Sequence, residues 1–283
     1  ANANAYTAAS KTCYMFSCTD NFESNLKLLL NVVTVPHFTK QSVEKEKSII
    51  NQEIRMYKDD PYWKMHFSLL EALYYKDTIK ADPAGTESSV AVVTPKLLYD
   101  THRMFYTAEN MVLCVCGDVA PDEVEDIVRK YLKPLQKGDV KRVGCNEPKD
   151  ICKKRVESFM DVAAPLFAIG IKCDDLQIGE ERIQACAENE IILQLVFGKS
   201  GEFYNRCYEE GLLGDRFSAD FSCERGTSYI MLCGSTPDPE RLYLKTLEEI
   251  RHRKESFCTV EEFERAKKVC YASALDTFNS TEG

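Results

Sequence analysis

The feature that most constrains the fold is an internal repeat, because the second half of the chain repeats the order of segments in the first. The strand-like run TCYMFSC (12–18) shares Thr, Tyr and Cys in register with TSYIMLC (227–233). The offset between matched segments changes only from 215 to 220 residues. Such a repeat predicts two related units in tandem. Each half continues with two helical segments, at 21–33 and 43–54 in the first and at 238–250 and 263–274 in the second.

We predict an α+β fold of two tandem homologous units, each a mostly antiparallel sheet with helices packed on one face. Residues 1–135 are assigned to the C-terminal part of a first domain and 161–283 to the N-terminal part of a second. The stretch 136–160 is predicted to be an exposed linker, since it is basic and poor in apolar residues. The second half has a strand at 164–173 and an apolar helix at 183–198 without counterparts in the first. We therefore expect both units to be incomplete and a matching helix to precede Ala1.

Charge and hydropathy exclude several classes of protein. The formal net charge is −9 and the chain has no long basic run, which argues against nucleic acid or an anionic membrane as a partner. The longest apolar runs are too short to span a bilayer. We predict a cytoplasmic protein with no membrane partner.

Thirteen cysteines raise the alternative of a secreted, disulfide-bonded protein. Their number is odd, however, and no CxxC pair occurs. Cys114 and Cys116 alternate within the strand-like run 110–117, so we interpret them as small core residues. This placement favours reduced thiols.

Two glutamates in the segment VEKEKSIINQEI (43–54) occupy an unusual place. Val43, Ile50 and Ile54 form an apolar stripe, and Glu46 and Glu53 are predicted at its edge, within about 20° of each other and about 10 Å apart along the axis. Neither glutamate has a Lys or Arg three or four positions away.

The repeat supplies a comparison, because its second copy has Ala266 and Ser273 at the positions of Glu46 and Glu53. Packing alone therefore does not require carboxylates on this helix. One interpretation is that both glutamates reach water from the helix edge. The other is a metal site, in which one carboxylate is a ligand and the other supports it. The four histidines are scattered and complete no zinc motif.

Five motifs give the chain a family resemblance. NAYT (4–7), PHFT (36–39), VEKEKSIINQEIRMYKDDPYW (43–63), AGT (84–86) and FYTAENM (105–111) resemble the inverzincin metallopeptidases. This family includes pitrilysin, insulin-degrading enzyme and the mitochondrial processing peptidase. The chain is most similar to the bacterial processing-peptidase-like branch.

The resemblance implies a role for four residues. Glu53 matches the family's distal zinc ligand, and Glu46 matches a glutamate that supports the metal shell. Asn4 and Ala5 match an edge strand that binds the substrate backbone. The other ligands and the general base belong to an HxxEH helix that this chain lacks, so no catalytic residue is expected within it. Tyr208 and Phe217 stand near where active relatives carry an Arg and a Tyr, and we do not transfer that role.

The resemblance therefore implies a zinc-dependent endopeptidase that acts on peptides or short unfolded segments in a two-domain chamber. The fragment itself is expected to be inactive and to hold no zinc. The alternative is a non-catalytic partner or scaffold subunit of the same fold. A paralogous partner subunit or a homodimer is compatible with either interpretation.

Overall fold

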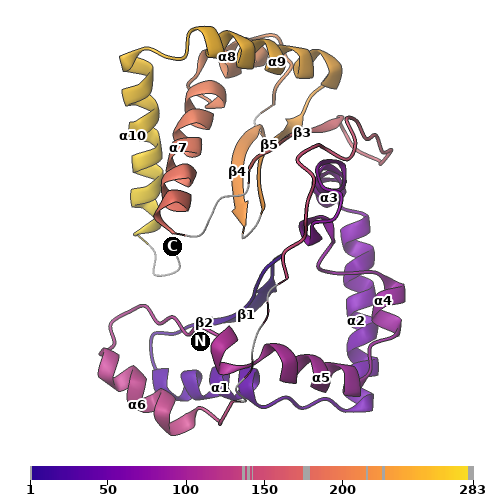
Figure 1. Cartoon of the computed structure of the whole chain (residues 1–283), viewed down its shortest axis with the longest axis vertical. Helices are drawn as coiled ribbons and strands as arrows, with labels where there is room; N and C mark the ends of the chain where they lie inside the picture. Colours follow the sequence, from indigo (N-terminus) through magenta and orange to yellow (C-terminus); the bar gives the residue numbers. More distant parts are fainter. Residues whose placement is uncertain are drawn as a thin grey trace. The chain divides into compact units, whose positions relative to one another are not determined.

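Figure 1 shows a computed structural model of the chain, which describes residues 2–135, 138, 141, 143–174, 179–214, 216–224 and 227–279. Helices and two antiparallel sheets confirm the predicted α+β class. The chain divides into two compact units. Unit 1 comprises Ala1–Met56 and Pro83–Val143, and unit 2 comprises Tyr57–Asp82 and Gly144–Gly283.

Unit 1 is built on a two-stranded antiparallel sheet of β1 (Asn2–Thr7) and β2 (Thr12–Ser17). One face of β2 meets helix α1, where the rings of Phe16 and Phe22 lie 6.3 Å apart. A small core forms where α1 packs against α6, from Leu26, Leu30 and Ile127. The helices of this unit are α1 (Phe22–Thr34), α2 (Lys40–Lys58), α4 (Glu87–Ala91), α5 (Pro95–Phe105) and α6 (Pro121–Tyr131), with a 3₁₀ turn at Ala108–Asn110.

Unit 2 contains a three-stranded antiparallel sheet in the order β3-β5-β4. Its strands are β3 (Leu166–Lys172), β4 (Ser218–Glu224) and β5 (Thr227–Ser235). The main core lies between one face of this sheet and the helices, and it includes the fully buried Phe203 and Leu232. The helices are α3 (Pro61–Leu73), α7 (Glu180–Phe197), α8 (Glu202–Glu209), α9 (Pro239–Glu255) and α10 (Val260–Thr277), with a 3₁₀ turn at Thr78–Lys80.

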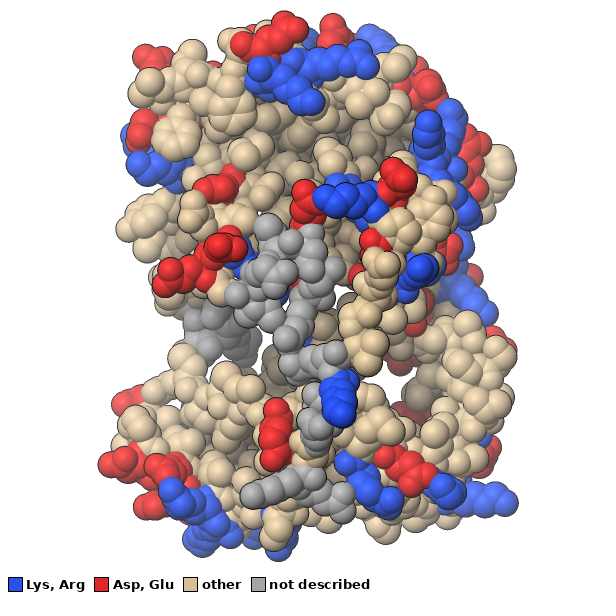
Figure 2. All heavy atoms as spheres, viewed as in Figure 1, with Lys and Arg blue, Asp and Glu red and all other residues tan. Residues whose placement is uncertain are grey.

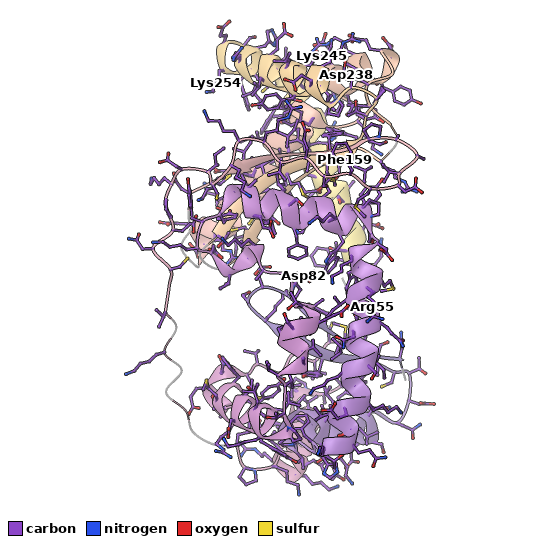
Figure 3. All side chains as sticks on the ribbon, turned by 90° about the vertical axis from the view of Figure 1, so that its right-hand side faces the viewer. Arg55, Asp82, Phe159, Asp238, Lys245 and Lys254 are labelled. Atoms are coloured by element: carbon purple, nitrogen blue, oxygen red, sulfur yellow. The ribbon has the colours of Figure 1, made fainter. Side chains whose placement is uncertain are left out.

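Local sequence explains where these helices begin. Asp60 caps α3 by accepting from the backbone N–H groups of Tyr62 and Trp63, and Pro61 stands in the first turn. Asp238 caps α9 in the same way and is labelled at its start in Figure 3. Both caps satisfy amide groups that have no partner within the helix.

Helix α3 covers the second face of the unit 2 sheet, whereas the sequence predicts helices on one face only. Gly170 allows this close approach, since a Cβ atom there would lie 2.8 Å from a methyl carbon of Leu69. Leu70, Leu73 and Tyr229 are buried in the contact. Residues 57–82, assigned above to the first domain, thus pack with unit 2. These residues join unit 2 because the apolar side of α3 packs on an apolar face of its sheet. The domain limits themselves stay a prediction.

The linker predicted at 136–160 is partly docked rather than exposed. The Glu147 carboxylate accepts from three successive backbone N–H groups, those of Tyr75, Lys76 and Asp77, at 2.7–2.9 Å. It also accepts from Lys172 Nζ at 2.8 Å, and both side chains are largely buried. Residues 136, 137, 139, 140 and 142 of this linker lie outside the described residues. Further along, Phe159 is almost fully exposed (Figure 3).

The strand predicted at 110–117 is wrong for this structure. Residues 111–117 are outside any ladder, although Met111 has extended backbone angles. The reason is that a strand needs a partner, and the described residues offer none to this segment. Cys114 and Cys116 are exposed instead of lying in a core. All thirteen cysteines are free thiols.

On the face seen in Figure 2, basic and acidic side chains are intermixed. Within the described part of the chain, no helix combines the length and apolar character needed to cross a membrane.

Candidate functional site

Helix α2 carries the two glutamates that the sequence analysis singled out. At its start, the Thr39 hydroxyl accepts from the Ser42 N–H and the Ser42 hydroxyl accepts from the Thr39 N–H, each at 3.0 Å. This reciprocal pair fixes the first turn. The helix then runs without a break to Lys58.

The predicted apolar stripe of α2 is confirmed. Val43 and Ile54 are buried and Ile50 is half-buried. A surface ion pair also forms, with Lys47 Nζ 2.9 Å from Glu44 Oε1, and Lys47 donates in addition to the Ala91 carbonyl. The orientation of α2 within unit 1 is therefore the one its periodicity predicts.

Glu46 and Glu53 are both exposed, as expected from the interpretation in which they reach water from the helix edge. Two apolar side chains lie on the same side of the helix, Ile49 at 47% and Met56 at 59% exposure. We call these four residues the α2 strip. Its carboxylates reach solvent because it lies beside the buried stripe and not within it.

The equivalent strip of α10 is buried at one position, Ala266, and exposed at Val269, Ser273 and Asp276. Helix α10 lies along α7 within unit 2, as Figure 1 shows. Ala266, at the position of Glu46, is only 3% exposed. In unit 2 this side of the helix thus meets another helix, and a small residue allows the close approach. Ser273, at the position of Glu53, is exposed near the end of α10.

The two predicted substrate-binding residues lie side by side on β1. Asn4 stands opposite Met15 and Ala5 opposite Tyr14, and the Asn4 side-chain oxygen accepts from the Ala5 N–H at 2.9 Å. Every residue of β1 is exposed, and its outer edge pairs with no other described strand. Tyr6 shares the Asn4 face and was not predicted, although the two-residue alternation of the strand would have identified it.

The histidines do not join the glutamates. His102 Nε2 lies 2.8 Å from the Val33 carbonyl and its ring stacks on Tyr106. His66 packs edge-on against Phe67, and burial lowers its pKa. Both are ordinary helix residues. Across the described part of the chain, no three His, Cys, Asp or Glu side chains come together as a metal-binding group.

Phe217 and Tyr208 of unit 2 stand near the positions where active relatives carry a Tyr and an Arg. Phe217 is buried, with its ring 6.4 Å from that of Phe167 and 5.9 Å from that of Tyr204. It is therefore a core residue that cannot reach a substrate. Tyr208 is exposed and stacks on Tyr204.

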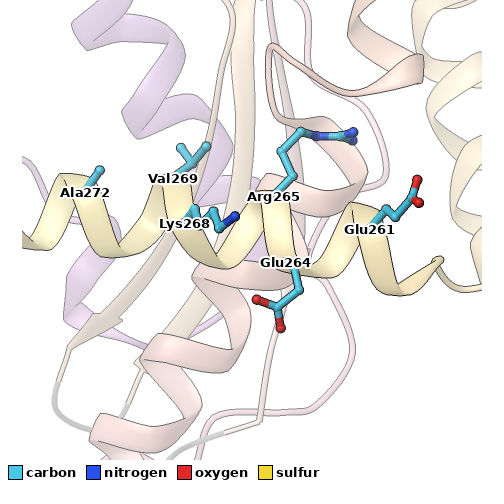
Figure 4. A pocket seen from close by; sticks show the side chains of 6 residues that line it. All are labelled: Glu261, Glu264, Arg265, Lys268, Val269 and Ala272. Carbon is cyan, nitrogen blue, oxygen red and sulfur yellow. The ribbon is translucent and has the colours of Figure 1, made fainter.

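A surface hollow on α10 does not coincide with any predicted site residue. Its lining residues all come from this one helix (Figure 4). A single helix cannot enclose a ligand, so we assign no function to it. The lining residues are Glu261, Glu264, Arg265, Lys268, Val269 and Ala272.

Comparison with protein families identifies the chain. Residues 1–87 match the insulinase family, peptidase family M16, and residues 93–270 match the M16 inactive domain. The zinc protease YmfH of Bacillus subtilis is 35% identical over 286 residues, which cover all of this chain and 67% of YmfH. The chain therefore belongs to peptidase family M16.

Solved structures agree with this assignment. An M16-like peptidase from Alicyclobacillus acidocaldarius superposes with a TM-score of 0.92 at 29% identity, over 99% of this chain and 67% of that one. A chain of Complex III from Candida albicans shares the fold, with a TM-score of 0.75 at 15% identity, over 99% of this chain and 68% of that one. The fold thus occurs both in an M16-like peptidase and in a chain of Complex III.

Proposed function

We propose that this chain is part of a zinc-dependent endopeptidase and that unit 1 supplies Glu53 as a metal ligand, with Glu46 supporting the metal shell. The observation that carries the proposal is the difference between the α2 strip and its counterpart on α10. The same helix position has carboxylates in one unit and Ala266 and Ser273 in the other. A metal-bearing unit and a metal-free unit account for this difference.

The donor set limits what the chain can do by itself. Carboxylate oxygen suits zinc, but structural and catalytic zinc sites use three or four protein ligands. The described residues gather no such set. The isolated chain therefore does not fit a zinc site, and its remaining ligands must come from outside these residues. We expect it to be catalytically inactive alone.

The substrate proposed for this site is an extended peptide that adds to the outer edge of β1, beside Asn4 and Ala5. The internal repeat supports the choice of edge. Strand β5 of unit 2 matches β2 and has a neighbouring strand on each side. Strand β4 matches β1 and lies at an edge of its sheet. Backbone hydrogen bonds along an edge bind peptides of many sequences.

A non-catalytic scaffold is the second candidate, favoured by the inactive-domain match and by the fold shared with the Complex III chain. A scaffold has no chemical need for Glu46 and Glu53. This is why we prefer the peptidase. A peptide substrate, a paralogous partner or homodimer, and a cytoplasmic location remain predictions.

The experiment compares this chain with a longer version that includes the preceding gene-encoded residues. Zinc content is measured by mass spectrometry and cleavage by a quenched fluorescent peptide. We expect the short chain to hold far less than one zinc and to cleave nothing, and the longer protein to hold one zinc and cleave. A longer protein without zinc or cleavage would establish the scaffold instead. Tightly bound, stoichiometric zinc in the short chain would contradict the proposed ligand set.

A further inference from the structure

Helix α7 and the edge strand β4 bring two cysteine thiols together in unit 2. The strand packs against the helix (Figure 1). The Arg182 guanidinium, in the first turn of α7, donates to the backbone carbonyl of Cys223 on β4. Cys186 follows Arg182 by one helical turn and therefore lies on the same side of α7. Its thiol is in hydrogen-bond contact with the thiol of Cys223. The two residues form a thiol pair between the helix layer and the sheet.

A third cysteine, on the same face of the sheet, is too far from Cys223 to compete. Cys173 directly follows β3 and donates its backbone N–H to the Ser228 carbonyl, and Ser228 stands opposite Cys223. The whole width of β5 thus separates Cys173 from Cys223, which is two strand spacings or about 9–10 Å. Bridged cysteines have Cα atoms no more than about 7 Å apart. Of these two thiols, the one within reach of Cys223 is that of Cys186.

We propose that Cys186 and Cys223 are a redox modification site, at which hydrogen peroxide forms a disulfide that fastens β4 to α7. The inference is independent of the proposed zinc and peptide sites of unit 1. Neither cysteine belongs to a CxxC motif, since the pair is assembled from a helix and a strand that are far apart in the sequence. In a reducing compartment the pair is two thiols, and it becomes bridged when the oxidant is present.

The surroundings of the pair assign a role to each sulfur. Burial and the neighbouring Cys223 raise the pKa of Cys186, while the positive charge of Arg182 acts in the opposite sense. Cys186 therefore keeps its proton and donates it to Cys223, so Cys223 is the sulfur that reacts first as a thiolate. Both side chains are half-buried, and a molecule as small as peroxide can reach them.

The reaction has two steps. The Cys223 thiolate attacks one oxygen of the peroxide, the O–O bond breaks, and the sulfur becomes a sulfenic acid. The hydroxide that leaves takes up the proton that Cys223 released and becomes water. The Cys186 sulfur then attacks the Cys223 sulfur, the S–O bond breaks, and the second hydroxide leaves as water with the Cys186 proton. Two thiols are oxidised by two electrons, and one peroxide is reduced to two waters.

The bridge should stabilise unit 2 against unfolding. Residues 186 and 223 enclose a long loop, and a disulfide that closes such a loop restricts the unfolded chain. Trp63 lies in unit 2, so its fluorescence follows the unfolding of that unit. We expect the oxidised chain to unfold about 5–10 °C above the reduced chain.

Mass spectrometry of the oxidised chain identifies the bond directly. The folded 283-residue chain is treated with limiting hydrogen peroxide, the remaining thiols are blocked with iodoacetamide, and the chain is digested with trypsin. Cys186 and Cys223 fall in different tryptic peptides, 183–199 and 217–225, which have one cysteine each. We expect these peptides to be linked, and to be at least about tenfold more abundant than any other linked pair, because bridging requires close Cα atoms. A reductant should separate them.

Serine variants distinguish the pair from the other thiols. Cys186→Ser and Cys223→Ser should each remove the linked peptides and the gain in unfolding temperature. Cys173→Ser, a matched change on the same sheet face, should leave both intact. Oxidation in concentrated urea should spread the bonds over many pairs, since the fold no longer selects one. Circular dichroism checks that each variant is folded.

Three results would overturn the inference. Peptides 183–199 and 217–225 that stay separate at peroxide concentrations that bridge the urea-unfolded chain would show that the folded pair does not react. A bond from Cys223 to the Cys173 peptide, 173–182, would show that the wrong partner was assigned. Linked peptides without a higher unfolding temperature would refute the fastening of β4 to α7.

Discussion

Units 1 and 2 are two copies of one structural plan, and the helices α2 and α10 show how they diverged. Both have an i, i+3 ion pair at the same place, Glu44–Lys47 in one and Glu264–Lys267 in the other. The apolar stripe of α2 is buried at Val43 and Ile54, whereas its counterparts on α10 are exposed or half-buried. They differ most at the position of Glu46, where α10 has the buried Ala266 and α2 has an exposed carboxylate. The two copies therefore keep the helix and its ion pair, and they bury different sides of it.

The largest effect is expected from giving unit 2 the residue of unit 1. Ala266→Glu places a charge in a site that is 3% exposed, and we expect a loss on the order of 3–5 kcal/mol in the free energy of unfolding. Trp63, the single tryptophan, lies in unit 2 and reports its unfolding in denaturant by fluorescence.

The reciprocal change, Glu46→Ala, should alter unit 1 by no more than about 0.5 kcal/mol, since Glu46 is exposed. Hydrogen exchange of the α2 amides measures it. If Ala266→Glu were tolerated as well as Glu46→Ala, the contrast between the two strips would have no physical basis.

A smaller difference is expected between two buried leucines, one in each unit. Leu26 of α1 and Leu242 of α9 are each 1% exposed. Leu242 lies in the large core of unit 2, whereas Leu26 lies in a small cluster that can collapse more easily. Truncation to Ala should cost about 4 kcal/mol at Leu242 and about 2–3 kcal/mol at Leu26. Hydrogen exchange of α1 and α9 amides measures both, and equal losses would show that the two cores are equally rigid.

The docked linker gives unit 2 a pH dependence. Burial by itself raises the pKa of Glu147, but the hydrogen bond from Lys172 and those from three backbone amides outweigh it and bring the pKa to about 2. The folded state therefore favours the charged carboxylate. This stabilisation, about 3 kcal/mol, is fully present above the ordinary glutamate pKa near 4.3 and is lost as the pH falls toward 2.

Glu147→Gln should lower the stability of unit 2 at pH 7 by about 1–3 kcal/mol, because Lys172 is left buried without its carboxylate. It should also flatten the acid part of the stability profile. Trp63 fluorescence between pH 7 and 3 measures both effects. Glu157→Gln, which changes an exposed ion pair with Arg155, is the control and should have little effect. An unchanged acid profile in Glu147→Gln would contradict the assignment.

The smallest effects are expected at the surface ion pairs that α2 and α10 share. Glu44→Gln and Glu264→Gln should each cost at most about 0.5 kcal/mol, and less in high salt. The N···O distances are 2.9 Å for Glu44 and 3.6 Å for Glu264, so the first pair should be the stronger. A loss well above 1 kcal/mol at either position, measured by thermal unfolding in low salt, would mean that the pair is more than a surface contact.

Much of the fold could be predicted because its signals are local. The Asp60–Pro61 cap, the stripe of Val43 and Ile54, and the repeated strand each depend on neighbouring residues only. The family could be predicted from motifs that are specific in length and composition. These features need no knowledge of which surfaces meet.

The errors concern contacts between distant segments. Whether 111–116 is a strand depends on a partner that the sequence of the segment does not name. The docking of α3 on the unit 2 sheet depends on Gly170, about a hundred positions away. Glu147 reads as an ordinary linker glutamate until its partners 70 residues upstream are known.

The most direct test of the account is the zinc content of the longer protein with Glu53→Gln, compared with Glu44→Gln as a matched control on the same helix. We predict one zinc per chain in the unchanged protein and in Glu44→Gln, and almost complete loss of zinc and of peptide cleavage in Glu53→Gln. Undiminished zinc in Glu53→Gln would show that unit 1 does not bind metal through this carboxylate.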